Sequence, residues 1–133
     1  MERSDRATLV ATDRIIVRRG GSMRVDRFLD IYRRSEVVGW FPVAPMLDRR
    51  DAVDCIERNL AQVAADARFG RWAVVDRSSG IPVGTVMLQL LPDGDGEIEI
   101  GWHLHPDSWG KGFASEAAGA VLERGFADGL PEV

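Results

Sequence analysis

Apolar side chains recur at helical spacing in three segments of the chain. The first segment begins after Ser22 and the second after Asp48, both suitable N-caps, and Gly70 closes the second. The third extends from Ala114 to Phe126. The apolar positions are Val25, Phe28, Leu29 and Tyr32, then Val53, Ile56, Leu60, Val63 and Ala67, then Ala117, Ala118, Val121, Leu122 and Phe126. The spacing predicts three helices, each with one buried face.

Four shorter segments have the β-branched or alternating composition of strands. Turn-forming residues separate them, such as Ser78-Ser79-Gly80 and the run from Pro92 to Gly96. The predicted strands are Arg14–Arg19, Arg71–Val75, Ile81–Leu91 and Glu97–Leu104. The order β-α-α-β-β-β-α predicts an α/β class with an antiparallel meander that runs into a strand-loop-helix crossover.

The segment between the last strand and the last helix reads HPDSWGKGFASE over residues 105–116. Gly110 and Gly112 lack a Cβ, so an anion can approach the main chain closely. Ala114 and Ser115 keep the side chains small where the helix begins. The N–H groups of its first turn have no helical partner, and the helix dipole favours negative charge there. The segment therefore predicts a site for a pyrophosphate.

Two well-known phosphate loops do not match this segment. A P-loop has four residues between its glycines and then Lys-Ser or Lys-Thr, whereas Lys111 stands between Gly110 and Gly112. The dinucleotide fingerprint has Gly or Ala three residues after its second glycine, where this chain has Ser115. The loop is therefore of another type.

The segment resembles the acetyl-CoA loop of the GCN5-related N-acetyltransferase (GNAT) superfamily, which reads Gln or Arg, two residues, Gly, one residue, then Gly or Ala. Gly112 and Ala114 match the small positions, and Trp109 replaces Gln or Arg. The string EIGWHLHPDSWGKGFASEA is similar to the branch that acetylates ribosomal protein N-termini and related amines, where Trp-Gly commonly replaces Arg-Gly. The strings TDRIIVRR, EVVGWF and FGRWAVVDRSSGIPVGTV are similar to that branch in the same order.

The resemblance implies a GNAT fold, with a mixed, mostly antiparallel sheet and helices on both faces, and acetyl-CoA as cosubstrate. In this family the strand before the loop offers main-chain groups to the pantetheine arm and thioester, which here implies Trp102, His103, Leu104 and His105. The implied diphosphate loop consists of Trp109, Gly110, Lys111, Gly112, Phe113, Ala114 and Ser115. Lys111 either pairs with a CoA phosphate or is simply solvated.

Acetyl transfer to an amine requires a route for the ammonium proton. Glu99 is the first candidate base, because it shares a strand face with Glu97, Gly101 and His103, and burial near the thioester would raise its pKa. The alternative is that both glutamates face solvent. His103 is the second candidate, since histidine titrates near neutral pH. Gly101 is expected to mark a β-bulge. The general acid is not identified, because Tyr32, the only tyrosine, belongs to a helix stripe.

Other chemistry-bearing residues have simpler interpretations. The resemblance places Trp40 and Phe41 at the acceptor wall, where they either receive the acceptor or pack in the core. His103 and His105 share a strand face, but no cysteine or third histidine accompanies them, so we expect no metal site. The single cysteine, Cys55, is expected to be a buried structural thiol.

Length, composition and charge fit one enzyme domain over residues 1–133, which the resemblance implies is incomplete. The apolar fraction of 45% is ordinary for a single domain. The net charge of −4 and the pI of about 5.2 offer no overall attraction for nucleic acid. The sequence has no long apolar run, and its start, MERSDRAT, lacks the apolar core of a secretion signal. We therefore expect a cytoplasmic protein with no membrane partner.

The last residues, GLPEV, resemble the approach to a further strand that complete family members place beside Glu97–Leu104. Without that strand, Glu97–Leu104 is an edge with unpaired main-chain groups, so we expect the chain to form a homodimer or to exchange elements. Two function hypotheses follow. The first is an N-acetyltransferase acting on a protein N-terminus or a small-molecule amine, and the second is a non-catalytic acyl-CoA-binding or assembly module.

Overall fold

A computed structural model describes residues 8–19, 25–38, 46–66, 69–90 and 96–130 of the chain. Its strands are β1 (Thr8–Ala11), β2 (Ile15–Arg19), β3 (Gly70–Asp76), β4 (Pro82–Leu90) and β5 (Ile98–Leu104). Its helices are α2 (Val25–Tyr32), α3 (Ser35–Val38), α4 (Arg49–Ala65) and α5 (Phe113–Ala127), with a 3-10 turn, η2 (Pro106–Ser108), between β5 and α5.

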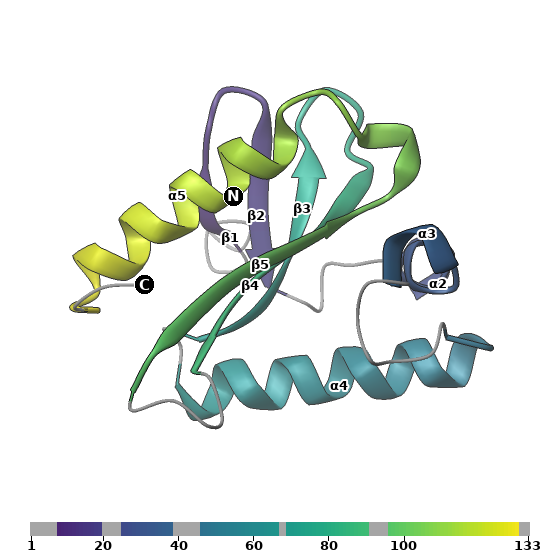
Figure 1. Cartoon of the computed structure of the whole chain (residues 1–133), viewed down its shortest axis with the longest axis horizontal. Coiled ribbons are helices and arrows are strands. Elements are labelled where there is room, and N and C mark those ends of the chain that lie inside the picture. The colour runs from purple at the N-terminus through teal and green to yellow at the C-terminus, as the bar shows by residue number, and fades with distance from the viewer. Residues whose placement is uncertain (1–7, 20–24, 39–45, 67–68, 91–95, 131–133) are drawn as a thin grey trace.

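The five strands form one sheet in the order β1-β2-β3-β4-β5, and every neighbouring pair is antiparallel. Consecutive strands are therefore neighbours throughout, as in a meander. Within the described ranges, β5 pairs with β4 on one side and its other edge is open. Beyond β5 the chain passes through η2 and returns across the sheet as α5 (Figure 1).

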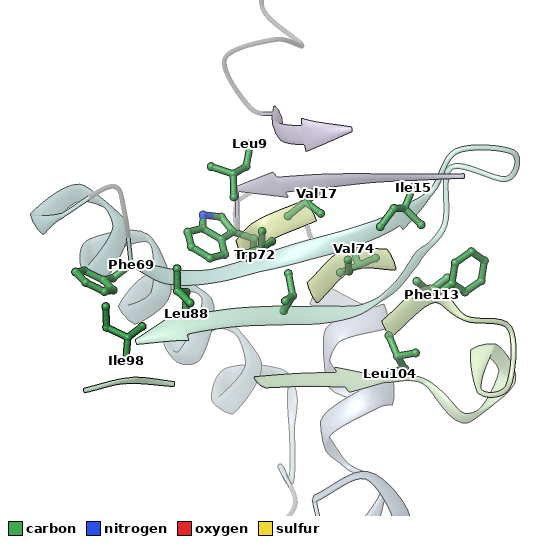
Figure 2. Close-up of a cluster of buried hydrophobic side chains, with 14 of the residues drawn as sticks. Leu9, Ile15, Val17, Phe69, Trp72, Val74, Leu88, Ile98, Leu104 and Phe113 are labelled. Carbon is green, nitrogen blue, oxygen red and sulfur yellow. The ribbon is translucent and has the colours of Figure 1, made fainter. Parts of the chain in front are cut away.

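Side chains alternate along β3 between two hydrophobic clusters, because successive residues of a strand point to opposite faces. Trp72 and Val74 join the cluster that α5 covers, whereas Ala73 and Val75 join the cluster under α2 and α4. Figure 1 shows α5 and α4 on opposite sides of the sheet. Figure 2 shows the α5-side cluster, which extends from Phe69 at one end to Phe113 at the other. The predicted α/β architecture, with helices on both faces, is thus confirmed.

The structure adds two elements that the hydrophobic pattern did not predict. Thr8–Ala11 forms β1, which pairs with β2 across a tight turn, and Ser35–Val38 forms the short helix α3. Four residues are too few to show a helical or strand period, so both elements depend on their packing partners. Gly70 begins β3 and does not close the preceding helix, which ends at Ala65.

Three finer predictions are wrong. Leu60 and Phe126 were expected on buried helix faces, yet they are 39% and 48% exposed. In the last turn of α5 it is Gly125 that is buried, since it continues the helical row from Val121 and lies against Leu88 and Leu130. The β4–β5 register also runs without interruption through Gly101, so there is no bulge at that glycine.

Candidate functional site

The glycine-rich loop lies between η2 and α5 and has the backbone that its sequence predicts. Gly110 has φ +77° and Gly112 has φ +79°, both in the left-handed region that side chains disfavour. Gly112 is the N-cap of α5 and offers no side-chain hydrogen bond to the helix. Within the described chain, the amides of Phe113, Ala114 and Ser115 therefore remain available to an anion in front of the helix.

Arg14, in the turn just before β2, anchors this loop through its guanidinium. Its Nη1 donates to Lys111 O at 2.8 Å, and its Nε donates to Glu116 Oε1 at 2.7 Å. The guanidinium also lies 4.8 Å above the centre of the Phe113 ring. A Cβ built on Gly112 would come within 3.2 Å of Arg14 Nη2. The β1–β2 turn therefore fixes both the loop and the first turn of α5.

Glu116 is the other half of this anchor. Its carboxylate accepts hydrogen bonds from the hydroxyl of Thr12 and from the main-chain N–H of Arg14. The Thr12 hydroxyl, followed by the Arg14 groups, lowers the pKa of Glu116 below its ordinary value. The carboxylate is therefore ionised at neutral pH. Sequence reasoning missed both Arg14 and Glu116, since no local pattern links positions this far apart.

His105 fixes the opposite end of the loop to α2. Its Nε2 lies 2.7 Å from Asp30 Oδ2, and its Nδ1 accepts from the N–H of Asp107 at 3.1 Å. Arg27 Nη2 in turn contacts both carboxylate oxygens of Asp107, at 3.0 and 3.1 Å. The His105 side chain is buried within this cluster. Asp30, Arg27 and Asp107 are further residues that the sequence pattern did not identify.

The open edge of β5 presents main-chain groups next to the loop. His105 N–H donates to Val83 O at 2.8 Å, so by alternation the N–H and C=O of Trp102 and the N–H of Leu104 point away from β4. The indole of Trp109 donates to Leu104 O at 2.9 Å and occupies that carbonyl. Of the segment Trp102–His105, Trp102 therefore has both polar main-chain groups directed to the open edge.

Gly84 allows β5 to approach β4 closely at this point. A Cβ on Gly84 would lie 2.2 Å from His103 O and 2.6 Å from Leu104 Cδ2, which is closer than atoms can come. Leu104 is the partner of Gly84 in the β4–β5 register, and His103 is the residue before Leu104. The position of the open edge thus depends on a glycine in the adjacent strand.

A cleft of about 460 Å³ follows the open edge of β5. Glu36 and Val37 of α3 line one wall, and Trp109, Gly110 and Ala114 line the other. The end of β5, from Trp102 to Leu104, forms its floor. The volume is within the range of small-molecule sites. The loop, the open edge and the N-terminus of α5 therefore converge on one cavity.

His103 is buried on the face of β5 that α2 covers. Its Nδ1 lies 2.9 Å from the Tyr32 hydroxyl, which also bonds the hydroxyl of Thr85. Burial, assisted by the positive charge of Arg71, lowers the pKa of His103 to about 4. The imidazole is therefore neutral at pH 7 and a much weaker base than the sequence argument expected. Burial raises the pKa of Tyr32, so its hydroxyl stays protonated as well.

Glu99 lies on the same face of β5 as His103 but is exposed, as is Glu97. Gln89 Nε2 donates to Glu99 Oε1 at 3.1 Å across the β4–β5 pair. Glu99 is therefore not buried, and both glutamates face solvent, as in the alternative given above. The Glu99 carboxylate is instead held by a neutral partner on β4.

The remaining predicted positions have simple placements. Lys111 and Ser115 are exposed, Trp109 is 48% exposed and Trp102 is 46% exposed. Cys55 is buried, as expected. Trp40 and Phe41 lie outside the described residues. Within the described parts of the chain, no three His, Cys, Asp or Glu side chains are grouped as metal ligands, and no helix combines the length and apolarity of a membrane span.

Comparison with protein families gives a match over most of the chain. Residues 14–133 match the family model described as "Acetyltransferase (GNAT) domain". The chain is 26% identical over 115 residues to "Uncharacterized N-acetyltransferase p20" of Bacillus licheniformis. The aligned region covers 86% of this chain and 64% of that protein. The chain is also 26% identical over 119 residues to "Uncharacterized N-acetyltransferase YoaA" of Bacillus subtilis, covering 90% of the chain and 67% of the relative. The chain thus spans about two thirds of the length of these relatives.

Solved structures show the same fold. A putative GnaT-family acetyltransferase from Bordetella pertussis superposes with a TM-score of 0.74 at 22% identity, over 91% of this chain and 73% of that one. A GNAT-family acetyltransferase from Bacillus anthracis gives a TM-score of 0.72 at 23% identity, over 90% of this chain and 66% of that one.

Proposed function

Because this chain belongs to the GNAT acetyltransferase family, we propose that it transfers an acetyl group from acetyl-CoA to a primary amine. The observation that carries the proposal is the convergence of three features on one cleft. These are the glycine loop with its available amides, the N-terminus of α5 and the open edge of β5. A diphosphate can accept hydrogen bonds from the amides of the loop and of the first turn of α5. The amide groups of a pantetheine arm can pair with the main-chain groups at the open edge of β5.

The chain contains a cradle that fits the diphosphate. Gly110 and Gly112 leave the main chain uncovered, and the first turn of α5 offers amides to an anion. The amide groups of the pantetheine arm can pair with Trp102 N–H and C=O in the manner of an added strand. The thioester then lies farther along the open edge of β5, away from the loop and beside the face that carries Glu99 and His103.

The proposed reaction joins the amine nitrogen to the thioester carbonyl carbon and breaks the C–S bond. The proton lost by the nitrogen leaves through a base, and the departing thiolate of CoA gains a proton from water or an acid. Glu99 is the proposed base, acting directly or through water, since its carboxylate is accessible and lies on the acceptor side. His103 is the less suitable candidate, because a group with a pKa of about 4 binds an amine proton weakly.

For the acceptor we propose a protein N-terminus or a small-molecule amine, received on the side of the sheet that α2 covers. The similarity of the loop to the branch that acetylates ribosomal protein N-termini supports the first, and we propose Trp40 and Phe41 as acceptor contacts. A cytoplasmic location is part of the same proposal. The open edge of β5 supports pairing with a second copy or exchange of elements, which sedimentation at micromolar concentration tests.

The test of the function is release of free thiol from acetyl-CoA with a panel of amines and N-terminal peptides. We expect acceptor-dependent thiol release and an acetylated product of the matching mass. A melting temperature that rises with CoA, without thiol release on any acceptor, would instead support the non-catalytic acyl-CoA-binding module. No response to CoA in either measurement would contradict both functions.

A further inference from the structure

Three residues form a row across β3, β4 and β5 on the face that α2 and α4 cover. Arg71 is opposite Met87, and Met87 is opposite Gly101. Arg71 lies on the same face of β3 as Ala73, because the two are two residues apart, and Ala73 packs under α2 and α4. Gly101 lies between Glu99 and His103 along that face of β5. The row therefore ends beside the two residues considered for proton removal.

The guanidinium of Arg71 extends along this row toward β5. Its Nη2 lies 3.5 Å from Met87 Sδ, and its Cζ lies 5.7 Å from the centre of the Tyr32 ring. A Cβ built on Gly101 would lie 3.5 Å from the same Met87 Sδ. The cation and the bare glycine thus share one neighbour, the thioether of Met87.

The described structure gives this half-buried cation no carboxylate partner. Five other arginines each have a carboxylate oxygen within 3.3 Å, namely Arg14, Arg27, Arg34, Arg50 and Arg124. A thioether is a weak acceptor, and an aromatic face attracts a cation only modestly. A partly buried guanidinium without a counter-ion is costly, so an arriving anion would be bound favourably.

Gly101 has no side chain between Arg71 and the surface of β5. The three atoms nearest to a Cβ built at this position all belong to Met87, at 3.4 to 3.7 Å, so a group of methyl size would make ordinary van der Waals contact there. The neighbouring side chains of His103 and Tyr32 are neutral at pH 7 because burial holds the pKa of His103 at about 4 and raises that of Tyr32. Neither side chain therefore neutralises the positive charge of Arg71.

Charges of opposite sign flank Gly101. Arg71 approaches from β3, and Glu99 is two residues away along β5 on the same face. This arrangement is complementary to a zwitterion whose ammonium faces Glu99 and whose carboxylate faces Arg71. A planar guanidinium is well suited to bind a carboxylate through two parallel hydrogen bonds.

We propose that Arg71 is a specificity-determining residue that binds a carboxylate of the acceptor, so that the acceptor is an amine bearing a carboxylate. The inference rests on the proposed acetyl transfer, and it narrows the acceptor class. A free amino acid and a peptide with an acidic first residue both present this chemistry. The first offers its α-carboxylate and the second its side-chain carboxylate.

The test compares acceptors that differ only in the carboxylate. Leucine is paired with 3-methylbutylamine, and a hexapeptide beginning with Glu is paired with the same peptide beginning with Gln. We expect the carboxylate-bearing member of at least one pair to have a kcat/KM about tenfold higher or more, mainly through KM, as for a hydrogen bond to a charged group. The pair that shows the difference identifies the source of the carboxylate.

Two variants of Arg71 and one control complete the design. Arg71→Met should abolish the preference, and Arg71→Lys should keep part of it, because it retains the charge without the planar fork. Arg50→Met, which removes an exposed arginine on α4, should leave the preference intact. Equal rates for both members in the unaltered protein, or a preference that survives Arg71→Met, would overturn the proposal.

A binding measurement separates this proposal from the proposed reaction. Calorimetry with leucine and 3-methylbutylamine, each in the presence of CoA, and likewise with the two hexapeptides, needs no turnover. If no thiol is released with any acceptor, the proposed reaction fails, yet tighter binding of a carboxylate-bearing member that Arg71→Met removes still supports the Arg71 site. Equal binding of both members of each pair, or no binding of any of them, would refute the site.

Discussion

Arg14 Nε lies 2.7 Å from Glu116 Oε1, which joins the turn before β2 to the first turn of α5 across 102 positions of sequence. The same guanidinium bonds Lys111 O inside the glycine loop. The loop is therefore held in its shape by a residue that is distant in the chain. Loop geometry and β1–β2 geometry are coupled through this pair.

Replacing Arg14 with methionine should weaken CoA binding without unfolding the chain. The pair is partly exposed, at 47% and 21% for the two side chains, so its loss should cost about 0.5–1 kcal/mol, or roughly a two- to fivefold rise in Kd. Calorimetric titration with CoA measures the change. Arg50→Met removes an ion pair within α4 and should leave the affinity unaltered. An unchanged Kd in Arg14→Met would show that the loop does not depend on this anchor.

Gly84 should tolerate no side chain. In Gly84→Ala the new Cβ would meet His103 O and Leu104, so β5 must move, and we expect a loss of about 1–3 kcal/mol in the free energy of unfolding. Gly119 on α5 has nothing within 4 Å of its Cβ direction, so Gly119→Ala should stabilise by about 0.5–1 kcal/mol. Urea unfolding of both variants tests the contrast. A Gly84→Ala protein as stable as Gly119→Ala would refute the close approach of β4 and β5.

His103 should make stability fall as the pH is lowered from about 6.5 to about 4. The unfolded chain binds a proton on this imidazole below its ordinary pKa of 6.5, whereas the folded chain does so only near 4, so protons favour unfolding in that interval. The contribution is up to about 3 kcal/mol at neutral pH. Urea unfolding of the unaltered protein and of His103→Asn at several pH values separates the contribution of His103 from that of the carboxylates. An NMR titration that gives His103 a pKa near 6.5 would contradict the prediction.

Glu99→Gln should lower kcat/KM by about 10² to 10⁴ if this carboxylate removes the amine proton. The substitution keeps the size of the side chain and its position opposite Gln89, so stability should be almost unchanged. Glu97→Gln, two residues earlier and equally exposed, is the matched control and should remain active. Equal activity of the two variants would exclude Glu99 as the base.

The sequence predicted what depends on local chemistry. Gly110 and Gly112 could be identified as loop glycines because a positive φ and an approaching anion are requirements of single positions. Three of the helices and four of the strands followed from their periodicity and composition. Short β1 and α3 have too few residues for a period, and they became visible only through the elements that they pack against.

The contacts that shape the site could not be predicted, because they join distant positions. Nothing near His105 in the sequence indicates that its partner is Asp30, and nothing near Gly112 indicates Arg14. Alternation correctly placed Glu99 and His103 on one face, but it could not show that Glu99 is exposed and His103 is buried. His103 contacts Tyr32 of α2, whereas Glu99 contacts Gln89 of β4.

The most direct test of the central claim is calorimetric titration of CoA into the unaltered protein, Gly112→Val and Gly96→Val. Both glycines have a positive φ, +79° and +82°, so valine strains the backbone at each position, but Gly96 precedes β5 and lies at the opposite end of that strand from the loop. We predict that Gly112→Val abolishes binding and that Gly96→Val binds like the unaltered protein. Equal affinity of Gly112→Val and the unaltered protein, or no binding of CoA by the unaltered protein, would contradict the assignment of this loop to the coenzyme.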